Sequence, residues 1–194
     1  TRHWIGTDYL AYVYAYNGTW FNEENTAGAV TDPGTIKGYQ LISDLINEYE
    51  VAPSPSASSE QAGISFESGK IAMNWSGTWD IRGTETTPSK WGFDWGVVMP
   101  PNGPEGQFPI VISNNWSIIS RSQHKEAAWT FLKWWNSDKN QRYLAKNGEF
   151  PSNIEIANEL AFTHLSDKDR ETLFKATDNA VARPTNVPVW ARTE

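Results

Sequence analysis

The sequence has no cysteine and no long hydrophobic run. None of its 194 residues is a cysteine, which excludes a disulfide framework and any thiolate metal site. No apolar segment approaches the roughly 20 residues that a membrane-spanning helix needs. With 39% hydrophobic and 20% charged residues, the composition is typical of a globular chain. The length allows one domain of ordinary size, which would bury roughly 70% of its unfolded surface.

Positive charge is also scarce. Lysine and arginine total 16 against 23 acidic residues, for a formal net charge of −7. This balance argues against nucleic acid as a partner and against long-range attraction of a strongly anionic ligand. The three histidines, at positions 3, 124 and 164, have no metal-ligand spacing, and no phosphate-loop or G-x-S-x-G pattern is present. We therefore expect no metal and no cofactor, and no catalytic residue is assigned.

Aromatic residues, by contrast, are abundant. The chain has 11 Trp, 7 Tyr and 8 Phe, which is more aromatic surface than a core of this size requires. Some of these side chains should therefore serve recognition.

One stretch, residues 66–80, combines several of these features. Gly69 and Lys70 indicate a tight turn, and the apolar segment 71–75 predicts a short buried strand. Gly77 would let the backbone come close to a partner where that strand ends, and Trp79 and Asp80 follow at once. Ligands of open α/β sheets bind at such strand ends. We interpret the stretch as the floor of a ligand cleft; the alternative is an ordinary buried strand with aromatic neighbours.

Apolar periodicity and capping residues predict helices along much of the remaining chain. Asp32 and Pro33 mark the start of a helix that ends before Val51, and its expected apolar stripe consists of Ile36, Tyr39, Ile42, Leu45, Ile46 and Tyr49. Ser122, Ser137 and Ser166 are expected at the starts of three other helices, Asn17-Gly18 and Asn147-Gly148 at the ends of two, and residues 25–29 as a hairpin loop. The predicted helices span residues 4–16, 33–50, 60–66, 123–136, 138–147, 153–165 and 167–181, and the predicted strands span 71–75, 91–99, 108–112 and 116–119.

Four passages resemble the extracellular solute-binding proteins of bacterial ABC importers, in the group of maltose-binding protein and the multiple-sugar receptors. The first is similar to F-x-x-G-K-x-A-M followed by G-x-W, and the second to P-x-G-P-x-G. The third is similar to E-A-A-W-x-F, S-x-x-x-Q and G-x-x-P, and the fourth is an R-P pair. They comprise Phe66, Gly69, Lys70, Ala72, Met73, Gly77 and Trp79; Pro101, Gly103, Pro104 and Gly106; residues 126–131 with Ser137, Gln141, Gly148 and Pro151; and Arg183 with Pro184.

The resemblance implies an α/β, type II periplasmic-binding-protein-like fold. It also implies that the chain is a C-terminal portion of its parent, without the N-terminal half and the last helices. Residues 1–117 would form the core of the second lobe, 118–165 would pack on the missing first lobe, and 166–194 would return to the second. The implied function is capture of a sugar or oligosaccharide outside the cytoplasmic membrane and its delivery to permease subunits. The protein would be periplasmic or lipid-anchored on the outer face of that membrane.

The same resemblance yields candidate ligand-binding residues. Sugars stack their C–H faces on indole rings and offer hydroxyls to amides and carboxylates. Where the family has a small pair such as Gly-Gly, this chain has Asn114 and Asn115, which can bind hydroxyls but take more room. The candidates are Trp79, Trp116, Asn114, Asn115, Asp80, Trp75, Trp190, Arg183, Trp4 and Asn17, whereas Trp129, Trp134 and Trp135 are assigned to packing or to exposure caused by truncation.

Two other classes of protein remain alternatives. A carbohydrate-active enzyme also uses aromatic clefts with carboxylates, and Asp80, Asp94, Glu67 and Glu149 are available, although none lies in a recognised catalytic motif. A carbohydrate-binding module with a β-sandwich fold is opposed by the several capped amphipathic helices. Another small polar solute, such as a glycerol phosphate ester, is the alternative ligand. We expect a binding protein rather than an enzyme.

Overall fold

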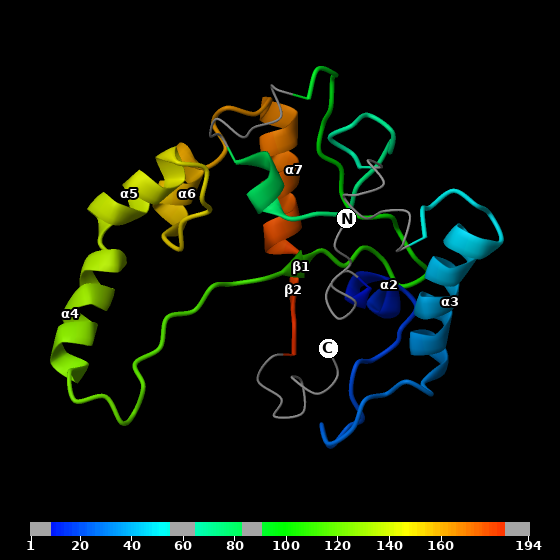
Figure 1. Ribbon diagram of the computed structural model, residues 1–194, viewed down its shortest axis with the longest axis horizontal. Coiled ribbons are helices and arrows are strands. Elements are labelled where there is room, and N and C mark those ends of the chain that lie inside the picture. The colour runs from blue at the N-terminus through cyan, green and yellow to red at the C-terminus, as the bar shows by residue number, and fades with distance from the viewer. Residues whose placement is uncertain (1–8, 55–64, 83–90, 185–194) are drawn as a thin grey trace. The chain divides into compact units, whose positions relative to one another are not determined.

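The computed structural model describes residues 9–54, 65–82 and 91–184 (Figure 1). Along the chain its elements are α2 (Leu10–Ala15), α3 (Pro33–Asn47), the 3₁₀ turn η2 (Thr78–Ile81), β1 (Ile110–Val111), α4 (Lys125–Trp135), α5 (Asp138–Lys146), α6 (Ile154–Leu160), α7 (Asp167–Asp178) and β2 (Val181–Ala182). The first part of the helix expected over 4–16 and most of that expected over 60–66 lie outside the described residues. No described helix is both long and apolar enough to cross a membrane.

These residues form two compact units. The first unit takes its described residues from 1–75, 95–112 and 171–194, and the second takes them from 76–94 and 113–170. The predicted division into residues 1–117, 118–165 and 166–194 refers to the lobes of a longer parent protein and stays a prediction.

In the first unit, α2 ends in the turn expected at Asn17 and Gly18. Asn17 has a φ of 59°, a left-handed conformation that asparagine tolerates better than most residues. Its N–H donates to the carbonyl of Tyr14 at 3.0 Å, and the N–H of Gly18 donates to the carbonyl of Val13 at 2.9 Å. This pair of bonds is a Schellman motif, which satisfies carbonyls at the helix end.

Helix α3 begins as predicted, with Asp32 as its N-cap and Pro33 at its first position. The carboxylate of Asp32 accepts from the N–H of Thr35 at 2.9 Å. The buried hydroxyl of Thr35 donates to the carbonyl of Thr19 at 2.6 Å, and the N–H of Thr19 returns a bond of 3.1 Å to that hydroxyl oxygen. Thr35 thereby fastens the helix start to the segment after α2.

The buried side of α3 matches the expected apolar stripe only in part. Tyr39, Ile42, Leu45 and Ile46 are half-buried, whereas Ile36 is 50% exposed and Tyr49, which lies beyond the end of α3, is 57% exposed. The buried positions are Gly34, Thr35 and Gly38, because α3 lies so close to α2 that a Cβ on Gly38 would be 2.8 Å from the Cα of Val13. Close approach of the two backbones therefore decides which face of α3 is covered.

Leu10, Trp20 and Phe21 form the buried core of the first unit, with Tyr14, Tyr39 and Ile110 packed against them. Trp20 and Phe21 belong to the hairpin predicted around 25–29, where Phe21 bridges Gly28. Burial raises the pKa of Tyr14 and of Tyr39. These aromatic side chains are therefore structural members of the unit.

Most of the predicted strands are wrong. The only strands among the described residues are β1 and β2, which pair in parallel with Ile110 opposite Val181. Segments 71–75, 91–99 and 116–119 have no strand assignment, and Met73, expected to be buried, is 82% exposed. Strands need hydrogen-bonded neighbours, and the one sheet among the described residues consists of β1 and β2.

The second unit contains α4, α5 and α6, with a small core around Ile156, Ala157 and Phe162. Ser137 caps α5, as predicted. The helix ends at Asn147 and Gly148, as expected, with the N–H of Gly148 donating to the carbonyl of Ala145 at 3.1 Å. The predicted helix over 123–136 begins two residues later than expected, at Lys125, and Ser122 accepts from the N–H of His124 at 3.1 Å instead of capping the helix.

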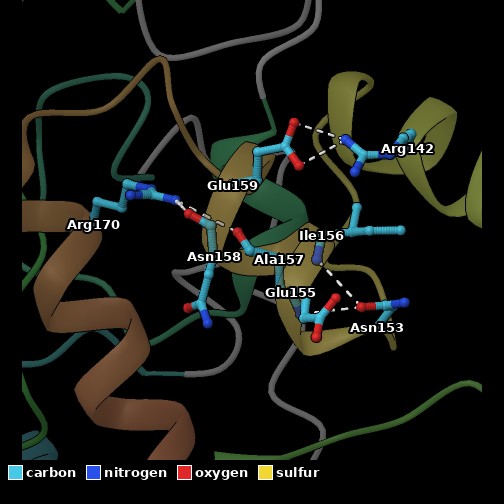
Figure 2. Close-up of polar contacts among 8 residues, drawn as sticks. All are labelled: Arg142, Asn153, Glu155, Ile156, Ala157, Asn158, Glu159 and Arg170. Carbon is cyan, nitrogen blue, oxygen red and sulfur yellow. Dashed lines mark hydrogen bonds and ion pairs between the residues drawn. The ribbon is translucent and has the colours of Figure 1, made fainter.

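Helices α6 and α7 begin within one residue of their expected starts and end earlier than expected. Asn153 accepts from the N–H groups of Glu155 and Ile156 (Figure 2), and α6 ends at Leu160 rather than at residue 165. Ser166 accepts from the N–H of Asp169 at 3.2 Å, and α7 ends at Asp178 because Val181 joins β2.

Candidate functional site

The turn η2 presents Trp79, our first candidate, at the surface of the second unit. The turn spans Thr78–Ile81 and begins after Gly77. The N–H of Asp80 donates to the carbonyl of Gly77 at 3.1 Å and closes the turn. Trp79 is 50% exposed, so half of a large apolar side chain is available to a ligand.

Gly77 provides the surface on which the Trp79 ring lies. A Cβ built on Gly77 would overlap the Cη2 and Cζ3 atoms of the indole and lie 2.5 Å from Cε3. We had expected the missing side chain to make room for a ligand beside the backbone. The structure corrects this interpretation, because the indole itself occupies that room.

Asp80 is used within its own turn. The hydroxyl of Ser76 donates to the Oδ2 atom of Asp80 in a short hydrogen bond. The half-buried carboxylate therefore ties residues 76 and 80 together, and its remaining lone pairs could accept from a ligand hydroxyl.

Two contacts connect the Trp79 turn to distant parts of the second unit. His164 Nε2 lies 2.9 Å from the carbonyl oxygen of Ile81, and Arg82 Nη1 lies 2.7 Å from Glu149 Oε1. Neither contact was predicted as part of the site, because each joins residues far apart in the sequence, 83 positions in the case of His164 and Ile81, and no local pattern predicts such a pair. His164 was noted only as lacking metal-ligand spacing, and Glu149 only as an available carboxylate.

Trp116, the second candidate, belongs to a different aromatic group. Its ring lies 5.8 Å from that of Phe131 and 5.2 Å from that of Trp135, while Trp134 completes the group at 5.7 Å from Phe131. We call Trp116, Phe131, Trp134 and Trp135 the α4 aromatic face. Trp116 is 56% exposed, and α4 has no buried residue.

Asn114 and Asn115 are both exposed. The side-chain amide of Asn115 donates to the hydroxyl of Ser113 at 3.3 Å. Both amides lie close in sequence to Trp116 and in the same unit as Trp79.

The remaining described candidates belong to the first unit. The Trp75 ring packs on Tyr12 of α2, with the ring centroids 5.4 Å apart. Asn17 is exposed at the end of α2, and half-buried Arg183 follows β2. Trp4 and Trp190 lie outside the described residues. The structure thus groups Trp79, Asp80, Asn114, Asn115 and Trp116 in one unit and Trp75, Asn17 and Arg183 in the other.

Within residues 9–54, 65–82 and 91–184, no group of three or more carboxylates and histidines is placed to hold a metal ion. The chemistry that the Trp79 turn offers is that of recognition: an apolar ring, a carboxylate beside it and backbone polar groups around it. Such a set of groups suits a ligand that is apolar on one face and rich in hydroxyls at its edge.

Comparison with solved structures confirms the type II periplasmic-binding-protein-like fold. The GacH receptor of Streptomyces glaucescens GLA.O, solved unliganded and with acarbose, is 26% identical with a TM-score of 0.68, and the match covers 92% of this chain and 47% of that one. Maltose-bound MalE3 of T. maritima is 25% identical with a TM-score of 0.66, covering 92% and 46%. The ABC substrate-binding protein Lmo0181 from Listeria monocytogenes, solved with cycloalternan, is 21% identical with a TM-score of 0.68, covering 91% and 45%.

The chain thus spans about half the length of these proteins. A comparison with curated proteins finds no match. Residues 2–142, more than half of the chain, match the family described as bacterial extracellular solute-binding protein, which confirms the resemblance found in the sequence. The chain belongs to this family of bacterial extracellular solute-binding proteins.

Proposed function

We propose that the protein containing this chain is the solute-binding component of an ABC importer that captures a sugar or oligosaccharide. Family membership supports the solute-binding role. The ligands of three similar structures, which are cycloalternan, maltose and acarbose, support a carbohydrate. Within this chain, the observation that carries the proposal is the half-exposed Trp79 ring seated on Gly77.

The energetics of stacking make one such ring important. Covering roughly 100 Å² of apolar surface shared by a sugar face and an indole stabilises the complex by on the order of 2.5 kcal/mol. That free energy corresponds to roughly a seventyfold change in the dissociation constant. Hydroxyls at the edge of the sugar would be bound by Asp80 and by the amides of Asn114 and Asn115.

The proposed role places the protein outside the cytoplasmic membrane, either in a periplasm or held by a lipid anchor on the outer face. The family description as extracellular supports export. Its partners would be the sugar and the permease subunits. No catalytic step is proposed, because the family and the similar structures are of binding proteins.

We also propose that residues 118–165 pack against a part of the parent protein outside this chain, as the resemblance implies. The support is the α4 aromatic face, whose helix has no buried residue. Apolar patches of this kind on proteins usually mark an interaction site. The ligand would then bind between two lobes that hinge shut on it.

Isothermal titration calorimetry on the full-length protein tests the proposal. The panel should include neutral maltooligosaccharides, acarbose and a glycerol phosphate ester, with the 194-residue chain titrated in parallel. We expect full-length protein to bind a neutral oligosaccharide and the 194-residue chain to bind it far more weakly, because the chain offers part of a cleft. Binding of the phosphate ester alone, or equally tight sugar binding by the 194-residue chain, would contradict the proposal.

A further inference from the structure

We propose that His164 and the Arg82–Glu149 ion pair are positioning residues for ligand binding, because they hold the Trp79 turn in place. The inference rests on the proposed function for its effect on affinity. It deepens that function by naming side chains that act on the ligand through Trp79. The family motif in residues 66–80 does not assign any of these side chains to the site.

The turn itself is too short to hold the indole in one orientation. It has four residues, and its polar contacts include the N–H of Asp80 to the carbonyl of Gly77 and the Ser76 hydroxyl to Asp80. A single 3₁₀ turn has few hydrogen bonds to offset the conformational entropy of its residues. External contacts must therefore help to fix its position.

His164 supplies one of these contacts. Its Nε2 lies 2.9 Å from the carbonyl oxygen of Ile81, and a carbonyl can only accept, so Nε2 must carry the proton. Ile81 is the last residue of η2 and follows Trp79 by two positions. The bond thus fixes the C-terminal end of the turn to the segment after α6.

The segment that carries His164 is held firmly. Phe162 is buried and has a φ of 54°, a left-handed conformation that is uncommon and unfavourable for a bulky residue. Such strain persists only where the surrounding structure enforces it, and it is concentrated at functional sites. The ring of Phe162 lies 6.2 Å from that of His164. The strained residue therefore redirects the chain two residues before the histidine.

Arg170 secures the same segment from α7. Its Nε donates to the carbonyl of Ala161 at 2.8 Å, and its Nη2 donates to the carbonyls of Ala157 and Asn158 (Figure 2). These carbonyls belong to the last turn of α6 and to its C-cap, where a helix leaves acceptors without intrahelical partners; that of Ala157 also accepts from the N–H of Ala161 at 2.9 Å. The end of α6 is therefore a firm base for His164.

The Arg82–Glu149 ion pair supplies the second contact. Arg82 follows η2 directly, and Glu149 lies in the turn that ends α5, where its N–H donates to the carbonyl of Leu144 at 3.1 Å. Both side chains are 39% exposed, so the pair contributes little to global stability. The role of the ion pair is to fix the position of the chain at the end of η2.

A double-mutant cycle in the full-length protein tests the inference, with affinity for the best oligosaccharide as the readout. We expect His164→Ala and Glu149→Gln each to weaken binding about fivefold, and His164→Gln to restore it because its amide donates from an equivalent place. In a Trp79→Ala background, His164→Ala should cause no further loss. Full additivity of the two losses would overturn the inference, since a residue acting through Trp79 has nothing to position once the ring is absent.

A second readout follows the ring itself and needs no ligand. In full-length protein labelled with 5-fluorotryptophan, the Trp79 resonance is assigned by Trp79→Phe. We expect His164→Ala and Glu149→Gln to shift or broaden it, and His164→Gln to return it. A resonance unmoved by both variants would overturn the inference whatever the affinity. If no sugar binds but the resonance moves, the proposed function fails and the positioning role stands.

Glu159→Gln is the matched control. Glu159 pairs with Arg142 at 2.7 Å in the same unit, and these side chains are also substantially exposed (Figure 2). The pair connects α5 and α6 without touching the Trp79 turn. Loss of this pair should leave both the Trp79 resonance and the affinity unchanged. If Glu159→Gln changed the resonance and the affinity as much as Glu149→Gln, loss of any ion pair in the unit would have the same effect. That result would contradict a specific positioning role for Glu149.

Discussion

The carboxylate of Asp32 begins helix α3 by accepting the N–H of Thr35 at 2.9 Å. That bond, made to the ionised form, is the largest cause holding the pKa of Asp32 below its ordinary value of 3.8. A carboxyl group with a depressed folded-state pKa stabilises the protein above its unfolded-state pKa. This contribution is lost as pH falls from about 3.8 through the lower folded-state value.

We expect Asp32→Asn to lessen the dependence of stability on pH in the acid range. Asparagine still caps the helix, but it does not titrate. The measurement is the urea midpoint between about pH 5 and about pH 3, which should fall less steeply for the variant than for the native chain. Asp44→Asn is the control, because the Asp44 carboxylate accepts from the Gln40 side chain rather than from a helix N-terminus. Parallel curves for native chain and Asp32→Asn would contradict this account.

At the scale of elements, local signals were predictable from the sequence and non-local ones were not. The caps at Asp32 and Ser137 and the ends at Asn17 and Gly148 were predicted because each depends on a few neighbouring residues. The strand predicted over 71–75 was wrong, because an apolar run becomes a strand only when another segment pairs with it.

The same distinction applies to the candidate site. The motif was sufficient to choose Trp79 as the first candidate, and the structure leaves that ring half exposed. It could not predict that Gly77 supports the ring or that His164 bonds to Ile81. Those contacts depend on a side-chain orientation and on a pairing of distant residues, neither of which a linear pattern encodes.

We expect Gly38→Ala to destabilise the chain by roughly 1–3 kcal/mol. The new Cβ would lie 2.8 Å from the Cα and 2.9 Å from the N of Val13, and backbone atoms cannot move aside cheaply. Intrinsic helix propensity alone favours alanine by about 1 kcal/mol, so the two effects have opposite signs. Urea unfolding measures the result, with exposed Lys37→Ala on the same helix as a control expected to change stability by less than about 0.5 kcal/mol. A stabilised Gly38→Ala would show that α2 and α3 do not pack this closely.

At the scale of the whole molecule, the principal feature is the α4 aromatic face. Trp116, Phe131 and Trp134 are all substantially exposed, and α4 buries none of its residues. The similar structures are about twice as long as this chain. A longer parent would therefore contain enough additional chain to cover the face.

We expect the 194-residue chain to bind an apolar fluorescent dye and the full-length protein to bind little of it. The double variant Phe131→Ser with Trp134→Ser should lower dye fluorescence severalfold in the 194-residue chain, because it removes half of the α4 aromatic face. Far-UV circular dichroism should remain unchanged. Equal dye binding by the two lengths of protein would mean that the parent leaves this face open.

Calorimetric titration of full-length Trp79→Ala against the native protein tests whether Trp79 is a stacking platform for a sugar. We expect the variant to bind the best neutral oligosaccharide more than about tenfold more weakly, with its unfolding temperature nearly unchanged because the ring is half exposed. An unchanged affinity in the folded variant would contradict this role.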